Sequence, residues 1–234
     1  AQEHIVSKGN YGDHMMPGEA PGKEEFISSE TPPPLVWTGY YYRGAVAVAE
    51  AAKVLGYQED SNQYARLAED IKKAFNKKWL NKDSCEYASG AQTANAFPLA
   101  LGIVPPESVQ GVVENLTQAI IEKHQGHLHT GNTGTTCLID TLTAHSQGEV
   151  MLGVVSQTSY PGWGFMVKEG ATTIWESWSL ESKVGDSESM IMWATIDEFF
   201  YNDLAGIKGP DYYGPDIMSP GFKDIIIEPH PLGG

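Results

Sequence analysis

Apolar side chains recur at steps of three and four residues over much of this chain, and this is the spacing of one helix face. The clearest case predicts a helix over residues 36–55 that Gly56 ends, because glycine readily adopts the left-handed conformation that follows a helix. A second helix is expected to begin at Asp60 or Ser61 as N-cap, with Gln63 reaching back. The predicted inward face of the first helix is Trp37, Tyr41, Gly44, Val48, Ala51 and Leu55. The apolar stripe of the second is Tyr64, Leu67, Ala68, Ile71 and Phe75.

Further helices are predicted at 91–101, after Pro105-Pro106, at 134–146, at 149–158 and at 188–204. The last is apolar along Met192, Trp193, Ile196, Phe199 and Phe200. Residues 1–34 are rich in glycine and proline, which predicts loops. Helix pairs in series indicate an all-α fold of the bundle, solenoid or α/α toroid kind.

The C-terminal part has a different character. Loop signals continue from Gly206 to Pro220, and F-K-D-I-I-I-E at 222–228 then reads as a β-strand. No later segment could pair with this strand, so we expect it to belong to a sheet that continues elsewhere. The sequence begins at Ala1 and ends just after this strand, and we interpret it as a piece of a longer protein.

Charge excludes several classes of function. The chain has 15 Lys and Arg against 30 Asp and Glu, a formal net charge of −15, which argues against binding to nucleic acid or to an anionic membrane surface. No apolar run approaches the roughly 18 residues of a membrane-spanning helix. Cys85 and Cys137 do not have metal-site spacing, and we expect two free, buried thiols.

The stretch G-A-T-T-I-W-E-S-W at 170–178 places Glu176 between Trp175 and Trp178, with Trp163 shortly upstream. Tryptophan is usually buried and carboxylates usually stay in water, so this mixture indicates a sugar pocket, with rings against the C–H faces and a carboxylate handling a proton or a water. The alternative is an edge strand or turn in which the three indoles belong to the core and Glu176 lies on the surface.

Several blocks extend this observation and carry a family resemblance. They are N-Y-G-D-H at 10–14, Y-Y-Y-R at 40–43, A-Q-T-A at 91–94, G-I-V-P at 102–105, H-L-H-T-G-N-T-G-T at 127–135, Q-T-S-Y-P-G-W-G-F-M at 157–166, G-A-T-T-I-W-E at 170–176 and D-L-A-G-I at 203–207. In this order they resemble the catalytic region of bacterial α-L-rhamnosidases, glycoside hydrolase family 78, whose catalytic domain is an (α/α)6 barrel.

This resemblance implies that residues 1–207 form part of an (α/α)6 toroid of the six-hairpin glycosidase kind. Residues 208–234 would then be a linker and the first strand of a β-sandwich. The family's general acid lies in an upstream G-W-x-G-D-A block that this sequence lacks. The expected partners are therefore a carbohydrate substrate, the missing upstream half of the barrel and flanking β-sandwich domains, with no cofactor. We favour a periplasmic or secreted location over a cytoplasmic one.

The resemblance also assigns chemistry. It implies an inverting mechanism in which Glu176 is the general base that activates water. Asp13 would accept hydrogen bonds from sugar hydroxyls, or would instead be an Asx-turn residue of its loop. Two of Trp163, Trp175 and Trp178 would stack on the sugar and the third would belong to the core.

Three more positions bear on the substrate. His127 and His129 would point the same way in an extended segment, and His129 is a candidate sugar contact beside the simpler interpretation of a structural histidine. A metal site is not expected there, because no third ligand has suitable spacing. His14 stands where the family usually has Trp, and Met190 where it often has His; both are expected near the pocket.

These two departures leave other functions open. One alternative is a carbohydrate-binding toroid without catalysis; another is a hydrolase of a different deoxy-sugar or of a uronic acid. The intact G-A-T-T-I-W-E block favours a hydrolase. As a piece of a toroid, the chain is expected to expose apolar faces on 36–55 and 192–200.

Overall fold

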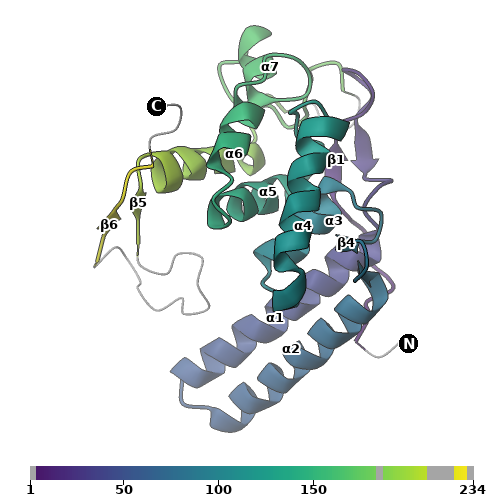
Figure 1. The fold of residues 1–234 in the computed structure, drawn as a ribbon, viewed down its shortest axis with the longest axis vertical. Helices are drawn as coiled ribbons and strands as arrows, with labels where there is room; N and C mark the ends of the chain where they lie inside the picture. The colour runs from purple at the N-terminus through teal and green to yellow at the C-terminus, as the bar shows by residue number, and fades with distance from the viewer. Residues whose placement is uncertain (1–3, 183–186, 210–223, 231–234) are drawn as a thin grey trace.

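Helices joined by short loops make up most of the fold (Figure 1). The computed structural model describes residues 4–182, 187–209 and 224–230. In chain order the α-helices are α1 (Pro33–Val54), α2 (Gln58–Trp79), α3 (Gln92–Ala100), α4 (Pro106–Gln118), α5 (Asn132–Ala144), α6 (Gly148–Val155), α7 (Trp163–Lys168) and α8 (Ile196–Glu198). A π-helix, η1 (Ala119–Lys123), continues α4; a 3-10 helix, η2 (Ile191–Thr195), and a π-helix, η3 (Phe199–Leu204), flank α8.

Helices α1 and α2 form an antiparallel hairpin whose far end extends away from the other helices (Figure 1). The predicted stop at Gly56 is confirmed: this residue has φ +82°, and its N–H bonds the carbonyl of Lys53 at 3.1 Å. The predicted start of α2 at Asp60 or Ser61 is wrong. The chain turns so tightly at Gly56 that α2 already begins at Gln58, without a side-chain cap.

The predicted inward face of α1 is also wrong. Tyr41 is 39% exposed, Val48 44% and Leu55 68%. Helix α1 instead turns its small residues toward α2, where Ala45 packs with Ala68 and Ile71. Small alanine side chains let the two helix backbones approach closely. The buried face of α1 is therefore the one that carries the alanines, not the one that carries the larger apolar residues.

Helix α3 lies at the centre of the fold and is buried along nearly its whole length. It packs against α1, α4 and α5, and the hydroxyl of Thr141 on α5 donates a hydrogen bond to the carbonyl of Ala96 at 3.1 Å. A Cβ at Gly39 of α1 would lie 2.1 Å from a ring carbon of Phe97, so only glycine permits this close crossing. The predicted helices at 91–101, 134–146 and 149–158 are confirmed within a few residues.

The predicted helix over 188–204 is shorter and less regular than expected. Residues 187–190 are not helical, because main-chain hydrogen bonds connect Ser187 to Glu176 and Met190 to Ile174, so helical structure begins only at η2. Trp193, Ile196 and Phe199 are buried as predicted, whereas Phe200 is exposed. Helix α7 was not predicted, because six residues are too few to show a helical period.

Three small antiparallel hairpins complete the described part of the chain. They are β1 (His14–Met16) with β2 (Glu25–Ile27), β3 (Leu80–Asn81) with β4 (Glu86–Tyr87), and β5 (Ile207–Lys208) with β6 (Ile226–Ile227). The predicted C-terminal strand is thus present, and it pairs with an earlier segment, with Ile207 opposite Ile227. The linker predicted before it falls largely on 210–223, outside the described residues. Among the described residues, no helix combines the length and apolar character of a membrane span.

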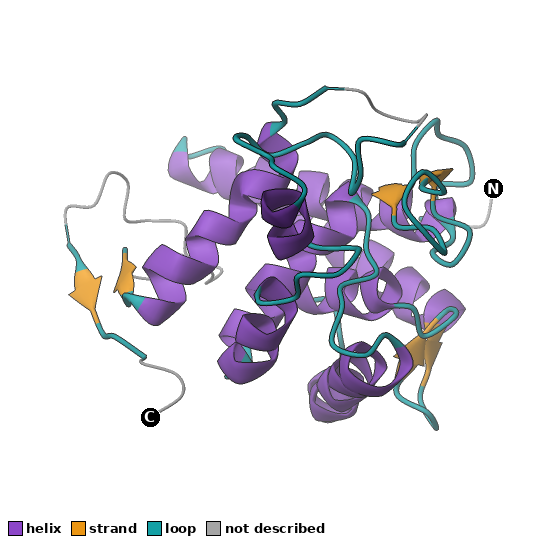
Figure 2. Cartoon of the chain, turned by 90° about the horizontal axis from the view of Figure 1, so that it is seen from above, coloured by secondary structure: helices purple, strands orange, loops and turns teal. Residues whose placement is uncertain are grey.

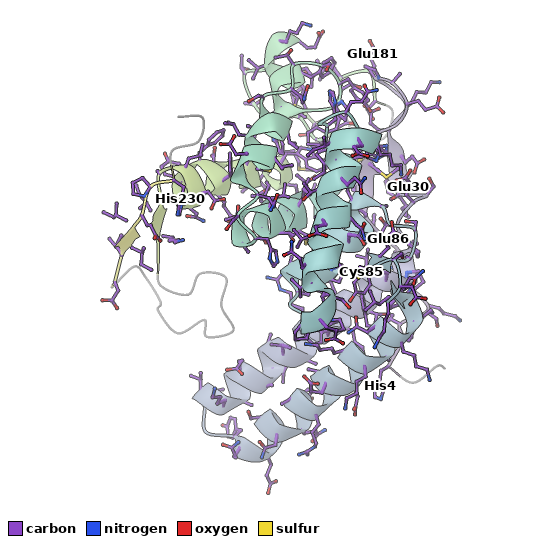
Figure 3. All side chains as sticks on the ribbon, in the orientation of Figure 1. His4, Glu30, Cys85, Glu86, Glu181 and His230 are labelled. Carbon is purple, nitrogen blue, oxygen red and sulfur yellow. The ribbon has the colours of Figure 1, made fainter. Side chains whose placement is uncertain are left out.

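Seen from above, loops and short helices lie over the ends of the longer helices (Figure 2). Helix α7 is at this end in Figure 1, and so is Glu181, which Figure 3 labels just beyond the G-A-T-T-I-W-E-S-W stretch. Cys85 and Cys137 are free thiols, as predicted, although both are half-buried.

Candidate active site

Glu176 lies on an irregular segment that two main-chain hydrogen bonds connect to residues 187–190. Its main-chain N–H donates to the carbonyl of Ser187 at 2.8 Å, and the N–H of Met190 donates to the carbonyl of Ile174 at the same distance. The Ser187 N–H in turn donates to Glu176 Oε2 at 3.2 Å. Glu176 is half-buried as a residue, so this hydrogen bond holds one carboxylate oxygen while part of the residue is open to solvent.

Three indoles support this segment. Trp193 Nε1 donates to the Glu176 carbonyl at 3.0 Å, and Trp163 Nε1 donates to the Trp193 carbonyl at 3.0 Å. Trp178 lies between them, edge-on to Trp163 at 5.5 Å and tilted against Trp193 at 4.4 Å between ring centroids. The relay of hydrogen bonds therefore fixes the Glu176 backbone from the core.

The predicted stacking residues are all inside the protein. Trp163 is 8% exposed, Trp175 3% and Trp178 0%. Rings buried to this extent present no open face to a sugar, so the geometry favours the alternative that all three belong to the core. Trp193 was not predicted to contact the Glu176 segment, because its helical spacing indicates only a core residue.

Asp13 is fully buried, and its carboxylate bonds only to the protein. Thr93 Oγ1 and the Gly131 N–H donate to Oδ2 at 2.5 and 2.8 Å, and the Gly134 N–H donates to Oδ1 at 3.0 Å. Burial raises the pKa of this carboxyl above its usual range, and the hydrogen bonds oppose that effect. Gly131 is the N-cap of α5, so Asp13 caps that helix from a distant part of the chain. This favours a structural role, in the form of a long-range cap rather than an Asx turn.

Glu24 joins the N-terminal loop to the candidate site. Its Oε1 accepts hydrogen bonds from Ser179 Oγ at 2.7 Å and from the Tyr160 hydroxyl at 3.2 Å, and the Gly22 N–H donates to Ser179 Oγ at 3.0 Å. These bonds connect the loop before β2 to both aromatic blocks. Glu24 could not be predicted from the sequence, because a single glutamate in a glycine-rich loop has no periodic signal.

The remaining predicted site residues are dispersed. His14 Nδ1 donates to the Phe26 carbonyl at 2.5 Å, and its ring packs edge-on against Phe26. Met190 is held by its backbone beside Ile174, two residues from Glu176. His127 and His129 have different neighbours: His127 Nε2 lies 2.8 Å from Ser159 Oγ, whereas the His129 ring packs on His124.

Of the two carboxylates expected at the sugar, only Glu176 is open to solvent. A half-buried, oriented carboxylate can accept a proton from a water molecule, which is the task of a general base. Helical hairpins around a buried α3 place the chain in the class of helical-hairpin domains. A family model described as the bacterial alpha-L-rhamnosidase 6 hairpin glycosidase domain matches residues 2–204, and the chain belongs to this family.

Individual proteins and solved structures that resemble this chain are α-L-rhamnosidases as well. An α-L-rhamnosidase of Alteromonas sp. (strain LOR) is 29% identical over 98% of this chain, which covers 25% of that protein. The structure of α-L-rhamnosidase from Dictyoglumus thermophilum matches with a TM-score of 0.86 and 36% identity over 99% of this chain and 25% of that one. Streptomyces avermitilis α-L-rhamnosidase complexed with L-rhamnose matches with a TM-score of 0.81 and 26% identity over 97% of this chain and 21% of that one.

The chain therefore spans about a quarter of the length of these relatives. The predicted family and the six-hairpin fold class are confirmed.

Proposed function

We propose that the protein is an inverting glycoside hydrolase that releases terminal α-L-rhamnosyl residues from glycosides or polysaccharides, with Glu176 as the general base. The observation that carries this proposal is the placement of Glu176: its backbone is fixed by Trp193 and Ser187, while the residue is only half-buried. The names of the relatives, and the L-rhamnose bound in one of them, support the choice of sugar.

An inverting enzyme needs a second carboxyl that protonates the leaving oxygen, roughly 6.5–9.5 Å from the base. Asp13 cannot serve, because it is sealed from solvent and bonded on both oxygens. Glu24 is 7% exposed and is engaged by Tyr160 and Ser179. We assign the general acid to the part of the protein that precedes this chain, as the resemblance implies.

We also propose that the chain belongs to two domains. Residues 1–207 would belong to the catalytic barrel and 208–234 to a linker and the first strand of a β-sandwich. The β5–β6 pair extends away from the helices in Figure 1, and Ile226 and Ile227 on it are exposed, as expected of a strand that packs against further structure. The upstream half of the barrel and flanking sandwich domains would be the intramolecular partners.

The test is hydrolysis of an aryl α-L-rhamnoside by the full-length protein, followed by proton NMR from the first turnovers. Release of β-L-rhamnose as the first product supports both the sugar and the inverting mechanism. First release of the α-anomer would contradict the role of Glu176 as a base. A folded protein that leaves this substrate intact would contradict the sugar and favour another deoxy-sugar, a uronic acid or carbohydrate binding without catalysis.

A further inference from the structure

Three potential metal ligands converge beside the loop that precedes α1. Glu30, His124 and His129 each offer one ligand atom, and these atoms all lie within 4.8 Å of one another. Figure 3 labels Glu30 beside α4, on the side of the molecule opposite His230. This cluster brings together two distant parts of the sequence, and the proposed hydrolase activity does not use it. No metal was expected at His129 from the local spacing, because Glu30 is far from it in sequence.

The polar atoms of this cluster lack partners within the described residues. Glu30 Oε2, His124 Nε2 and His129 Nδ1 are all buried, and none has a hydrogen bond. Buried polar atoms in native proteins nearly always have a partner, so three orphans in one cluster indicate that something is bound among them. The other oxygen of Glu30, Oε1, lies 3.7 Å from Lys123 Nζ, which leaves Oε2 for a second cation.

The backbone holds the two imidazoles together. After η1 the chain reverses through Gln125 and Gly126, at φ +53° and +82°, and the His127 N–H closes the turn on the His124 carbonyl at 2.9 Å. The ring centroids of His124 and His129 are consequently 4.3 Å apart. The His129 N–H also donates to Gln92 Oε1 at 2.7 Å, so this arm of the cluster is fixed to α3.

Glu30 is fixed just as firmly. Its N–H donates to Ser28 Oγ at 3.2 Å, and its carbonyl accepts from Ser89 Oγ at 2.7 Å. A neutral imidazole offers a ring lone pair to a metal ion, and His124 Nε2 and His129 Nδ1 are the ring atoms without a hydrogen bond.

We propose that Glu30, His124 and His129 bind a single divalent transition-metal ion, with Zn²⁺ as the best match. Two imidazoles and a carboxylate form a set that Zn²⁺ accepts, with a water molecule in the fourth position of a tetrahedron. Zn–N distances of about 2.0–2.1 Å place tetrahedral ligands about 3.3 Å apart, so small side-chain rotations must close the cluster. The ion would tie the loop before α1 to the connection between α4 and α5.

The experiment uses metal-free full-length protein dialysed against Zn²⁺, with bound metal measured by plasma mass spectrometry. The variants are Glu30→Gln, which keeps shape and volume, and His129→Ala; His145→Ala, at the end of α5, is the matched control. We expect wild type and control to bind one more equivalent of zinc per chain than the two variants. Added Zn²⁺ should also raise Tm for wild type and control by more than for Glu30→Gln.

Equal zinc content in folded wild type and folded Glu30→Gln would overturn the proposal, as would a wild type that binds no zinc. The second result would mean that water satisfies the three orphan atoms. Substitution with Co²⁺ provides an independent readout, because a tetrahedral His–His–carboxylate site gives a strong visible absorption. Absence of that absorption in the wild type would exclude the proposed tetrahedral site, whatever the hydrolase assay shows.

Discussion

The indole N–H of Trp193 donates a hydrogen bond to the main-chain carbonyl of Glu176 at 3.0 Å. Trp193 is fully buried, and its own carbonyl accepts a hydrogen bond from Trp163. The position of the candidate base is therefore set by the aromatic core beneath it.

Replacing Trp193 with Phe should lower activity more than stability. Phe keeps most of the ring volume but cannot donate to the Glu176 carbonyl. Displacement of a catalytic group by about 1 Å can cost on the order of 10²-fold, so we expect kcat/KM of the full-length protein to fall roughly 10- to 100-fold. Trp79→Phe, on α2, is the matched control and should retain activity. Equal activity of the two variants would show that the hydrogen bond does not position the base.

Asp13→Ala should destabilise the fold, because it leaves the hydroxyl of Thr93 and the N–H groups of Gly131 and Gly134 without an acceptor. A buried orphaned donor costs about 1–3 kcal/mol, so we expect a total loss of roughly 3–5 kcal/mol in the free energy of unfolding. Urea unfolding monitored by circular dichroism measures this loss. Asp83→Ala, in the exposed β3–β4 loop, should change the free energy by less than about 0.5 kcal/mol. Similar values for both variants would contradict the capping role of Asp13.

Asp140 predicts a dependence of stability on pH. Burial and the nearby Glu198 raise its pKa from 3.8 to about 7, although Arg43 opposes the shift. Between these two values the unfolded chain has lost the proton that the folded chain still holds, so this group makes stability fall as pH rises from about 4 to about 7. Asp140→Asn removes this contribution. Its free energy of unfolding should therefore decrease less than that of the wild type between pH 5 and pH 8, and parallel profiles would contradict the assignment.

The exposed apolar residues predict that the 234-residue chain self-associates on its own. Val48 and Leu55, seven residues apart on one face of α1, are 44% and 68% exposed, and Ile191 is 82% exposed; apolar surface of this kind can associate with a second copy. Sedimentation velocity should show oligomers, and replacing Leu55 and Ile191 with Lys should reduce them. A monomeric chain with a sharp, reversible two-state melt would contradict this prediction.

Much of the fold was predictable from the sequence because local signals set it. The 3.6-residue period, Gly56 and the Pro105-Pro106 pair indicated helices whose ends the structure confirms within a few residues. The buried face of α1 was not predictable, because close packing of Ala45 and Ala68 outweighs the larger apolar stripe. Likewise, the last helix is shortened by pairing with residues 173–176, which no local pattern in 187–190 reveals.

The candidate site, like the fold, was predictable only in part. Glu176 stood out because a carboxylate among indoles is unusual, and the structure leaves it accessible. The roles of Asp13, Glu24 and His129 depend on contacts that the local sequence pattern does not show. Asp13 bonds Thr93, Glu24 bonds Ser179, and the His129 ring packs on His124. Residue type and spacing suggested polar chemistry at Asp13 and His129, but only the fold shows which partners use those polar groups.

The central claim is that Glu176 activates the attacking water. The most direct test is kcat/KM of the full-length protein on an aryl α-L-rhamnoside for Glu176→Gln beside Glu181→Gln, an exposed glutamate five positions further along. A positioned base contributes about 10²–10⁴-fold, so Glu176→Gln should lose activity in that range while Glu181→Gln stays near the wild type. If a folded Glu176→Gln variant kept activity within a few-fold of Glu181→Gln, Glu176 would not be the catalytic base.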